Sequence, residues 1–330
     1  MEYRFVGRTG MRVSKLALGT MAFGTDADER TSEAIFQRAL DAGINHFDTA
    51  DVYGGGRSEE LLGRFIRPHR DRLVLATKAY FPSADDPNAR GASRYHLVRA
   101  VEGSLRRLGT DRVDLLYVHR HDAFTAPEET LRALDDLVRS GKVLYPALSN
   151  YAAWQAMQAV GLTERMGLAR PVCIQPMYNL VKRQAEVELL PMAEAVGLGV
   201  FPYSPLGGGL LSGKYGTHAR PASGRLVDNA MYQTRYGDPQ HYTTAERFDA
   251  LARERGHHPV SLAIAWVAHH PAVTAPLIGA RNLEQLEPAL AAADLPMDDA
   301  LHAEIAALSP TPPPATDRNE ERSAHNYGAR

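Results

Sequence analysis

Short apolar runs alternate with longer amphipathic segments along most of this chain, and this alternation limits the folds that it can adopt. The runs are almost continuously apolar, which is typical of parallel strands buried on both faces. Between them lie helical patterns such as "ERTSEAIFQRALDAG" and "PEETLRALDDLVRSG", several of which end in a glycine suited to a helix C-terminus. The apolar runs are "LALG", "HFD", "LVLATK", "VDLLYVH", "VLYPALSN", "VCIQ", "LGVFPYS" and "TAPLIG".

About eight strand and helix units of about 35 residues each predict an α/β fold, a (β/α)8 TIM barrel. Ahead of them, "YRFVG" and "MRVSKL" flank "RTG" and predict an N-terminal β-hairpin that closes the bottom of the barrel. A doubly wound sheet is the structural alternative, but it would place a G-x-G-x-x-G turn after the first strand. The segment "LGTMAFG" lacks that spacing.

No linker rich in proline, glycine or serine divides the units, so we expect residues 1–330 to form a single barrel domain. Residues 309–330 are rich in proline and charge without apolar periodicity, which predicts a surface or partly disordered C-terminal tail. The connection from about 216 to 242 is long, and long structureless connections in compact folds are commonly lids or disordered.

Charge and cysteine content narrow the partners and the compartment. The chain has 37 basic and 39 acidic side chains, a formal net charge of -2, which gives no indication of nucleic acid or an anionic membrane as a partner. Cys173 is the only cysteine, so no intramolecular disulfide can form, and no leader or bilayer-length apolar run is present. We expect a cytoplasmic protein that acts on a small molecule, with a homo-oligomer possible.

Polar residues stand where several predicted strands end, and in a barrel these ends meet at one mouth. The segment "HFDTADVYGGG" supplies Asp48 and Tyr53, and Lys78 and His119 close two later runs. Taken singly, Asp48 fits a helix cap, Lys78 a solvated strand end and His119 a structural histidine. Together they describe a proton donor, because the Lys78 ammonium would lower the pKa of the Tyr53 phenol. A neutral imidazole at His119 would orient a carbonyl oxygen.

With these motifs the sequence resembles the aldo-keto reductases, from the opening hairpin to about residue 295. It is most similar to the branch of bacterial and potassium-channel-β-subunit-like members. The motifs "FDTADVYG", "LATKAY" and "DLLYVHRHD" correspond to those that carry the family's catalytic residues. The resemblance implies a catalytic tetrad of Asp48, Tyr53, Lys78 and His119. It also implies that a nicotinamide cofactor supplies the hydride, because none of the four side chains can donate one.

The same resemblance implies the cofactor-binding positions, from one end of the nucleotide to the other. Ser149, Asn150 and Gln175 would hold the carboxamide, and Tyr203 would stack on the nicotinamide ring. Arg281 favours NADPH, because a guanidinium can engage the 2′-phosphate, and use of NADH stays open. Ala289 replaces an asparagine common in relatives, so we expect one adenine contact to be lost. The other positions that the resemblance assigns to the cofactor are Gly19, Thr20, Ser204, Leu206, Gly208, Lys214, Gly279 and Gln285.

Phe23, Tyr80, Phe81 and Arg120 are the candidate walls of a substrate pocket, with His121 and the 216–242 connection as further candidates. The leading hypothesis is an NADPH-dependent reductase of an aldehyde or ketone, with a keto-sugar or a secondary-metabolite carbonyl as the substrate. A nucleotide-sensing barrel with little turnover, like a channel β subunit, is the alternative. A metal-dependent hydrolase would use Asp48, His119, His121 and His46, but it leaves the nicotinamide segment without a purpose, and we expect no metal site.

Overall fold

Eight parallel strands form the centre of the computed structural model, which describes residues 1–316. The strands are hydrogen-bonded in the order β10-β3-β4-β5-β6-β7-β8-β9. The two end strands meet through backbone bonds from Leu277 N to Pro202 O (2.8 Å) and from Thr274 N to Val200 O (2.9 Å), which close the sheet into a barrel. The strands are β3 (Ala17–Gly19), β4 (His46–Asp48), β5 (Val74–Ala79), β6 (Val113–Val118), β7 (Val143–Ser149), β8 (Cys173–Gln175), β9 (Gly199–Val200) and β10 (Leu277–Ile278).

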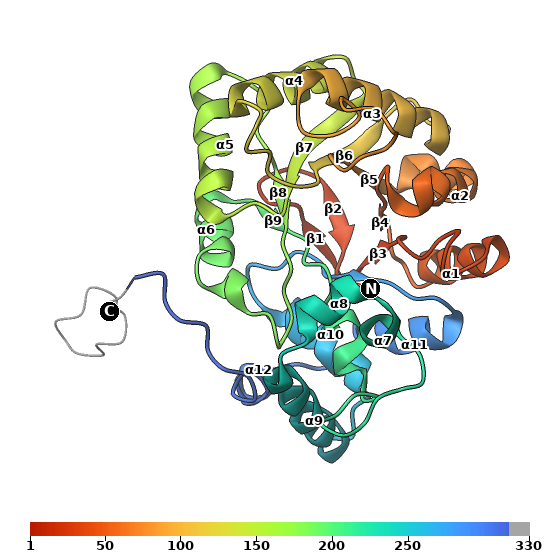
Figure 1. Cartoon of the computed structure of the whole chain (residues 1–330), viewed down its shortest axis with the longest axis vertical. Helices are drawn as coiled ribbons and strands as arrows, with labels where there is room; N and C mark the ends of the chain where they lie inside the picture. Colours follow the sequence, from red (N-terminus) through yellow and green to blue (C-terminus); the bar gives the residue numbers. More distant parts are fainter. Residues whose placement is uncertain (317–330) are drawn as a thin grey trace.

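Helices surround this barrel and follow the strands along the chain (Figure 1). Capping residues define where these helices begin and end, as α3 shows. The Ser93 hydroxyl caps the N-terminus of α3 by accepting from His96 N, and Gly109 ends this helix with φ 63°. The helices are α1 (Glu29–Asp41), α2 (Arg57–Ile66), α3 (Arg94–Leu108), α4 (Pro127–Arg139), α5 (Ala153–Met166), α6 (Leu189–Val196), α7 (Arg225–Asp228), α8 (Ala230–Tyr236), α9 (Pro239–Glu254), α10 (Pro259–His269), α11 (Leu283–Ala291) and α12 (Asp299–Ala306).

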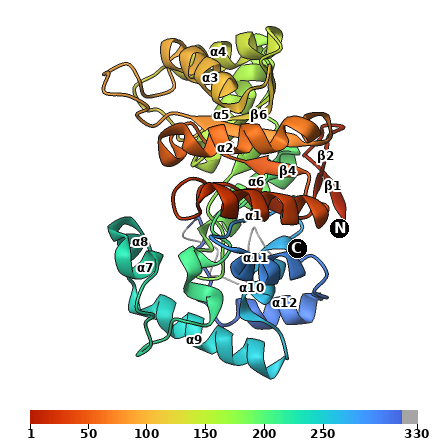
Figure 2. The same cartoon turned by 90° about the vertical axis from the view of Figure 1, so that its right-hand side faces the viewer.

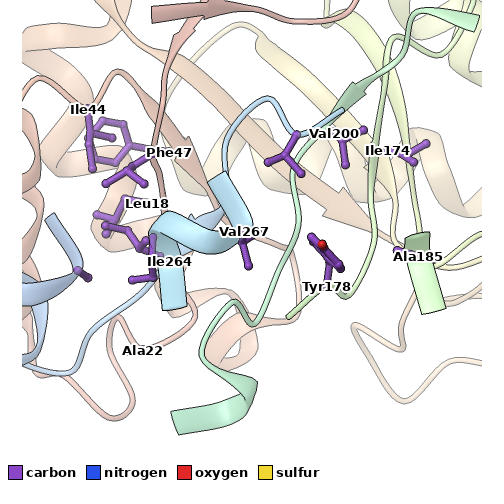
Figure 3. Close-up of a cluster of buried hydrophobic side chains, with 14 of the residues drawn as sticks. Leu18, Ala22, Ile44, Phe47, Ile174, Tyr178, Ala185, Val200, Ile264 and Val267 are labelled. Atoms are coloured by element: carbon purple, nitrogen blue, oxygen red, sulfur yellow. The ribbon is translucent and has the colours of Figure 1, made fainter. Parts of the chain in front are cut away.

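Side-chain alternation along the strands creates two buried layers. Phe47 of β4 and Leu18 of β3 face outward and pack with Ile264 of α10, as Figure 3 shows. The neighbours of these residues along each strand face the barrel interior, where Val74, Leu115 and other apolar side chains form a second cluster. This alternation also decides which polar side chains reach the interior at the other end of the strands.

An antiparallel hairpin of β1 (Tyr3–Phe5) and β2 (Arg12–Ser14) closes one end of the barrel. Val6 and Val13 belong to the interior cluster, and Arg8 N donates to Gly197 O just before β9 begins (3.2 Å). Figure 2 shows the hairpin and the pair α7 and α8 at opposite ends of the molecule. The prediction of a (β/α)8 barrel with an N-terminal hairpin is therefore confirmed.

The connection at 216–242 differs from the structureless segment that its composition suggests. It contains α7 and α8, and α9 begins within it at Pro239. The Asn229 side chain caps α8 by accepting from Met231 N and Tyr232 N. This cap favours a helix here although the segment has no sustained apolar periodicity. Of the predicted C-terminal tail, residues 309–316 lack helix and strand and are mostly exposed, and the rest lies outside the described residues.

Candidate active site

A cavity of about 590 Å³ opens at the C-terminal ends of the strands, away from the hairpin. It gathers most of the predicted site residues, although they come from segments that are far apart in the sequence. The predicted residues that line it are Gly19, Asp48, Tyr53, Phe81, His119, Arg120, Ser149, Asn150, Gln175, Tyr203, Ser204, Leu206, Gly208, Lys214, Gly279, Arg281 and Gln285.

A buried ion pair lies at the base of this cavity. The Lys78 side chain is 0% exposed, and its ammonium bonds to Asp48 Oδ1 and to the Thr49 carbonyl oxygen (2.8 Å). Gln175 Nε2 donates to the other oxygen, Asp48 Oδ2 (2.9 Å). Burial disfavours the ammonium, but the interactions with Asp48 and Tyr53 outweigh this effect and raise the pKa of Lys78, so Lys78 is charged at neutral pH.

A turn of three glycines places Tyr53 above this pair. Gly54, Gly55 and Gly56 all have positive φ (59°, 64° and 96°), a conformation that side-chain-bearing residues rarely adopt, and α2 begins at the next residue. Lys78 Nζ lies 5.1 Å from the centroid of the Tyr53 ring. The phenol therefore sits between the buried ammonium and the cavity.

The pKa of Tyr53 corrects one expectation. The Lys78 ammonium does favour the phenolate, but burial of the phenol is the larger effect, and the pKa of Tyr53 is raised above its ordinary value. Tyr53 consequently carries its proton at neutral pH and can donate it. The Lys78 charge offsets part of the cost that burial imposes on a phenolate at this position.

His119 completes the cluster from the end of β6. Its ring lies 6.1 Å from the Tyr53 ring and 4.9 Å from the Phe81 ring, both in edge-on geometry. Burial, and then the Lys78 charge, lowers the pKa of His119 to about 3, so the imidazole is neutral. Its Nδ1 atom is buried and has no hydrogen-bond partner within residues 1–316. A neutral imidazole at this position can donate a hydrogen bond to an oxygen in the cavity.

The strands β7, β8 and β9 end in a hydrogen-bonded rim. Tyr203 OH donates to Asn150 Oδ1 (2.8 Å), Asn150 Nδ2 donates to His119 O (2.9 Å), and Ser149 Oγ donates to Gln175 O (3.0 Å). Asn150 and Ser204 are the non-glycine residues with positive φ in the described chain, at 56° and 57°. Backbone strain of this kind persists where the surrounding structure holds it, commonly at functional sites.

Positive charge gathers at the other end of the cavity. Lys214, Arg225 and Arg281 all line it, and Gln285 Oε1 accepts from Arg281 N (3.2 Å) at the start of α11. Burial, and then the charges of Arg281 and Arg225, lowers the pKa of Lys214. A cluster in which cations disfavour one another's charge is well suited to an anion such as a phosphate group.

Besides Lys78, which lies buried at the base, Phe23, Thr20 and Tyr80 are predicted residues that do not line the cavity. Phe23 is 1% exposed and packs edge-on against Phe65 in the outer core, because the turn after β3 directs its side chain away from the mouth. Thr20 is buried, where its hydroxyl bonds to Asp48 O and Ser58 Oγ. Tyr80 packs against the core, and the centroid of its ring lies 5.3 Å from that of Phe81.

Four cavity residues that the sequence did not single out come from α7 and α8: Arg225, Met231, Tyr232 and Arg235. Their segment was a candidate wall, but nothing in its pattern told which side chains face inward. A Cβ atom placed on Gly208 would lie 2.7 Å from Tyr232 Cδ1, so α8 packs directly on the glycine-rich segment after β9. Ala289 also lines the cavity, at the position where we expected a lost adenine contact.

The histidines of the metal-site alternative do not converge. His46 lies inside the barrel, with its ring 4.8 Å from that of Phe201, and His121 lies 5.2 Å from the Tyr151 ring outside the cavity lining. Within the described residues, no group of three or more His, Cys, Asp and Glu side chains could hold a metal ion.

Comparison with known proteins agrees with this geometry. The model of the "Aldo/keto reductase family" matches residues 15–310. The chain belongs to this family. Membership of this family makes the protein an NAD(P)H-dependent oxidoreductase.

Named relatives of this aldo/keto reductase include both enzymes and channel subunits. It is 42% identical to "Uncharacterized oxidoreductase YrpG" of Bacillus subtilis, over 90% of this chain and 93% of that protein. It is 37% identical to "Probable voltage-gated potassium channel subunit beta" of rice (Oryza sativa subsp. japonica), over 89% and 92%. It is 34% identical to a "Putative aryl-alcohol dehydrogenase" of Schizosaccharomyces pombe, over 90% and 92%. No helix among residues 1–316 has the length and apolar character to cross a bilayer.

The residues present fit an NAD(P)H cofactor. The cavity runs from the Tyr53 phenol to the cations Lys214 and Arg281. Gly208 and Gly209 line the cavity without side chains and adopt positive φ (69° and 100°), so a ligand can approach the backbone of the segment after β9 closely. The cavity thus has the phenol at one end, a glycine-rich segment that a ligand can approach closely, and cations that suit an anionic group at the other end.

Proposed function

We propose that this aldo/keto reductase reduces an aldehyde or ketone to an alcohol with NADPH, and that Tyr53 is the proton donor. One observation carries the proposal: the Tyr53 phenol lies at the cavity beside the fully buried Lys78 ammonium, which is paired with Asp48. A phenol in this setting holds its proton at neutral pH, and the ammonium beneath it stabilises the phenolate once the proton has left.

Each of the remaining side chains has a part in the same step. NADPH, when bound, supplies the hydride that reduces the carbonyl carbon. Neutral His119 donates a hydrogen bond to the carbonyl oxygen and orients it toward Tyr53. Asp48 keeps Lys78 in place, and Gln175, through its bond to the second oxygen of Asp48, positions that carboxylate. Gln175 therefore supports the tetrad in addition to the cofactor contact that the family resemblance implies.

The cofactor would lie along the rest of the cavity. Asn150 and Ser149 would hold the carboxamide, with the Tyr203 ring against the nicotinamide. Lys214 and the glycine-rich segment suit the pyrophosphate, and Arg281 with Gln285 suits the 2′-phosphate. NADH remains a second substrate for the same site, because only the phosphate contact would be lost. The cytoplasmic location expected from the sequence stays a prediction.

The wall beside the proton donor supports an aromatic or other ring-bearing carbonyl substrate. Phe81 packs edge-on against His119, and Met231 and Tyr232 of α8 line the same cavity. Flat apolar surfaces of this kind bind rings, with Arg120 available for a polar substituent. The aryl-alcohol name of the Schizosaccharomyces pombe relative agrees with this substrate class.

The test follows NADPH consumption optically with a panel of aromatic aldehydes, simple ketones and keto-sugars. Tyr53→Phe should lower turnover by about 10²- to 10⁴-fold, the contribution of general acid catalysis, with NADPH affinity within a few-fold of the parent. Tyr95→Phe is the matched control, because Tyr95 is an exposed hydroxyl of α3. Equal turnover in parent and Tyr53→Phe would refute the assignment. Tight NADPH binding without turnover of any compound would favour the nucleotide-sensing alternative.

A further inference from the structure

An acidic side chain sits among the cations at the anion end of the cavity. Asp26 belongs to the connection between β3 and α1, and its Oδ2 atom lies 3.2 Å from Arg281 Nε and 3.8 Å from Arg225 Nη2. Both arginines line the cavity, whereas Asp26 reaches them from outside its lining. One carboxylate oxygen thus joins three segments: the first connection, α7 and the segment after β10.

Asp26 is also the one carboxylate within 4.0 Å of either guanidinium in the part of the chain that the structure describes. The side chains are partly exposed, 45% for Asp26, 36% for Arg281 and 29% for Arg225, so water or a ligand can replace the ion pair. Ion pairs of this exposure are weak and exchange partners readily. The Arg281 fork is therefore held by a group that an incoming anion can displace.

We propose that Asp26 competes with the 2′-phosphate of the cofactor for Arg281 and so limits the preference of this enzyme for NADPH over NADH. The inference rests on the proposed function. A phosphate dianion that approaches Arg281 must displace the carboxylate and then remain near its negative charge. NADH presents a hydroxyl there instead, and a carboxylate can accept a hydrogen bond from it. Asp26 therefore weakens the binding of NADPH and leaves the binding of NADH largely unchanged.

The test compares Asp26→Asn with the parent protein by fluorescence titration with NADPH, NADH and 2′,5′-ADP. We expect the dissociation constants of NADPH and 2′,5′-ADP to fall by about fivefold to tenfold, since one fewer negative charge faces the phosphate. The dissociation constant of NADH should change less than about twofold. The gain should shrink as ionic strength rises, because the groups are partly exposed. Asp294→Asn, which removes an exposed carboxylate beyond the end of α11, is the charge-matched control.

A double-mutant cycle with Arg281→Ala separates competition from a general effect of charge. If Asp26 acts through Arg281, most of the gain from Asp26→Asn disappears in the Arg281→Ala background. Equal gains for NADPH and NADH, or weaker NADPH binding in Asp26→Asn, would overturn the inference while leaving the proposed function intact. A parent protein that binds neither nucleotide would overturn the proposed function, and the inference with it.

Discussion

Asp48→Asn should destabilise the protein through the lysine that it leaves behind. The Lys78 ammonium is fully buried, and without Asp48 its remaining fixed acceptor is the Thr49 carbonyl oxygen. Removing one partner of a buried ion pair typically costs about 3–5 kcal/mol, because the other charge stays desolvated. The double variant Asp48→Asn with Lys78→Met should recover most of this loss, since an apolar side chain of similar length fills the same space.

Urea unfolding at pH 7 measures the free energy of unfolding of the parent, the single variant and the double variant. In Asp48→Asn the folded-state pKa of Lys78 should fall below its unfolded value of about 10.4. Above about pH 10.4, Lys78 is neutral in both the folded and the unfolded state and does not reduce the stability of this variant. As the pH falls below that value, the free energy of unfolding decreases by about 1.4 kcal/mol for each unit between the two pKa values. The gap between single and double variants should therefore narrow as the pH approaches 10. Equal stability of the two variants at pH 7 would show that Lys78 is not desolvated as described.

Two further predictions concern buried titratable groups. Asp51 is 3% exposed, neither carboxylate oxygen has a partner within residues 1–316, and burial followed by the Glu59 charge raises its pKa to about 7. A raised pKa means that stability present at about pH 4 is lost as the pH rises through 7, so Asp51→Asn should add about 2–4 kcal/mol to the free energy of unfolding at about pH 8 and little at about pH 4; a gain independent of pH would contradict this. Because the pKa of His119 is about 3, kcat/KM for carbonyl reduction should show no imidazole inflection between about pH 5 and 8. An inflection in that range that vanishes in His119→Gln would contradict the neutral assignment.

Sequence patterns predicted most of this site because a barrel brings the C-terminal ends of all its strands to one mouth. The short runs predict strands, and the last polar residue of each run comes to the mouth, as Asp48, His119 and Gln175 do. Side-chain direction just beyond a strand is set by the turn, so the inward or outward placement of Phe23 and Thr20 could not be predicted. The sign of the Tyr53 shift needed the depth of burial, which no spacing of residues reveals.

Part of the cationic end of the cavity could be predicted from the sequence. Arg281 and Lys214 are identifiable from their segments, but the contact between Asp26 and Arg281 depends on how the first and last connections of the barrel meet. The short helices α7 and α8 have no sustained apolar period, because each is about two turns or less and packs through a few side chains such as Tyr232.

The N-terminal hairpin decides how this protein can be attached to a surface. Met1 lies beside the hairpin, on the side of the molecule opposite α7 and α8 (Figure 2). A tether fused ahead of Met1 would hold the molecule by its base and leave the mouth pointing into solution, where small molecules can enter. Immobilised in this way, the protein should keep the nucleotide affinity that it has when free.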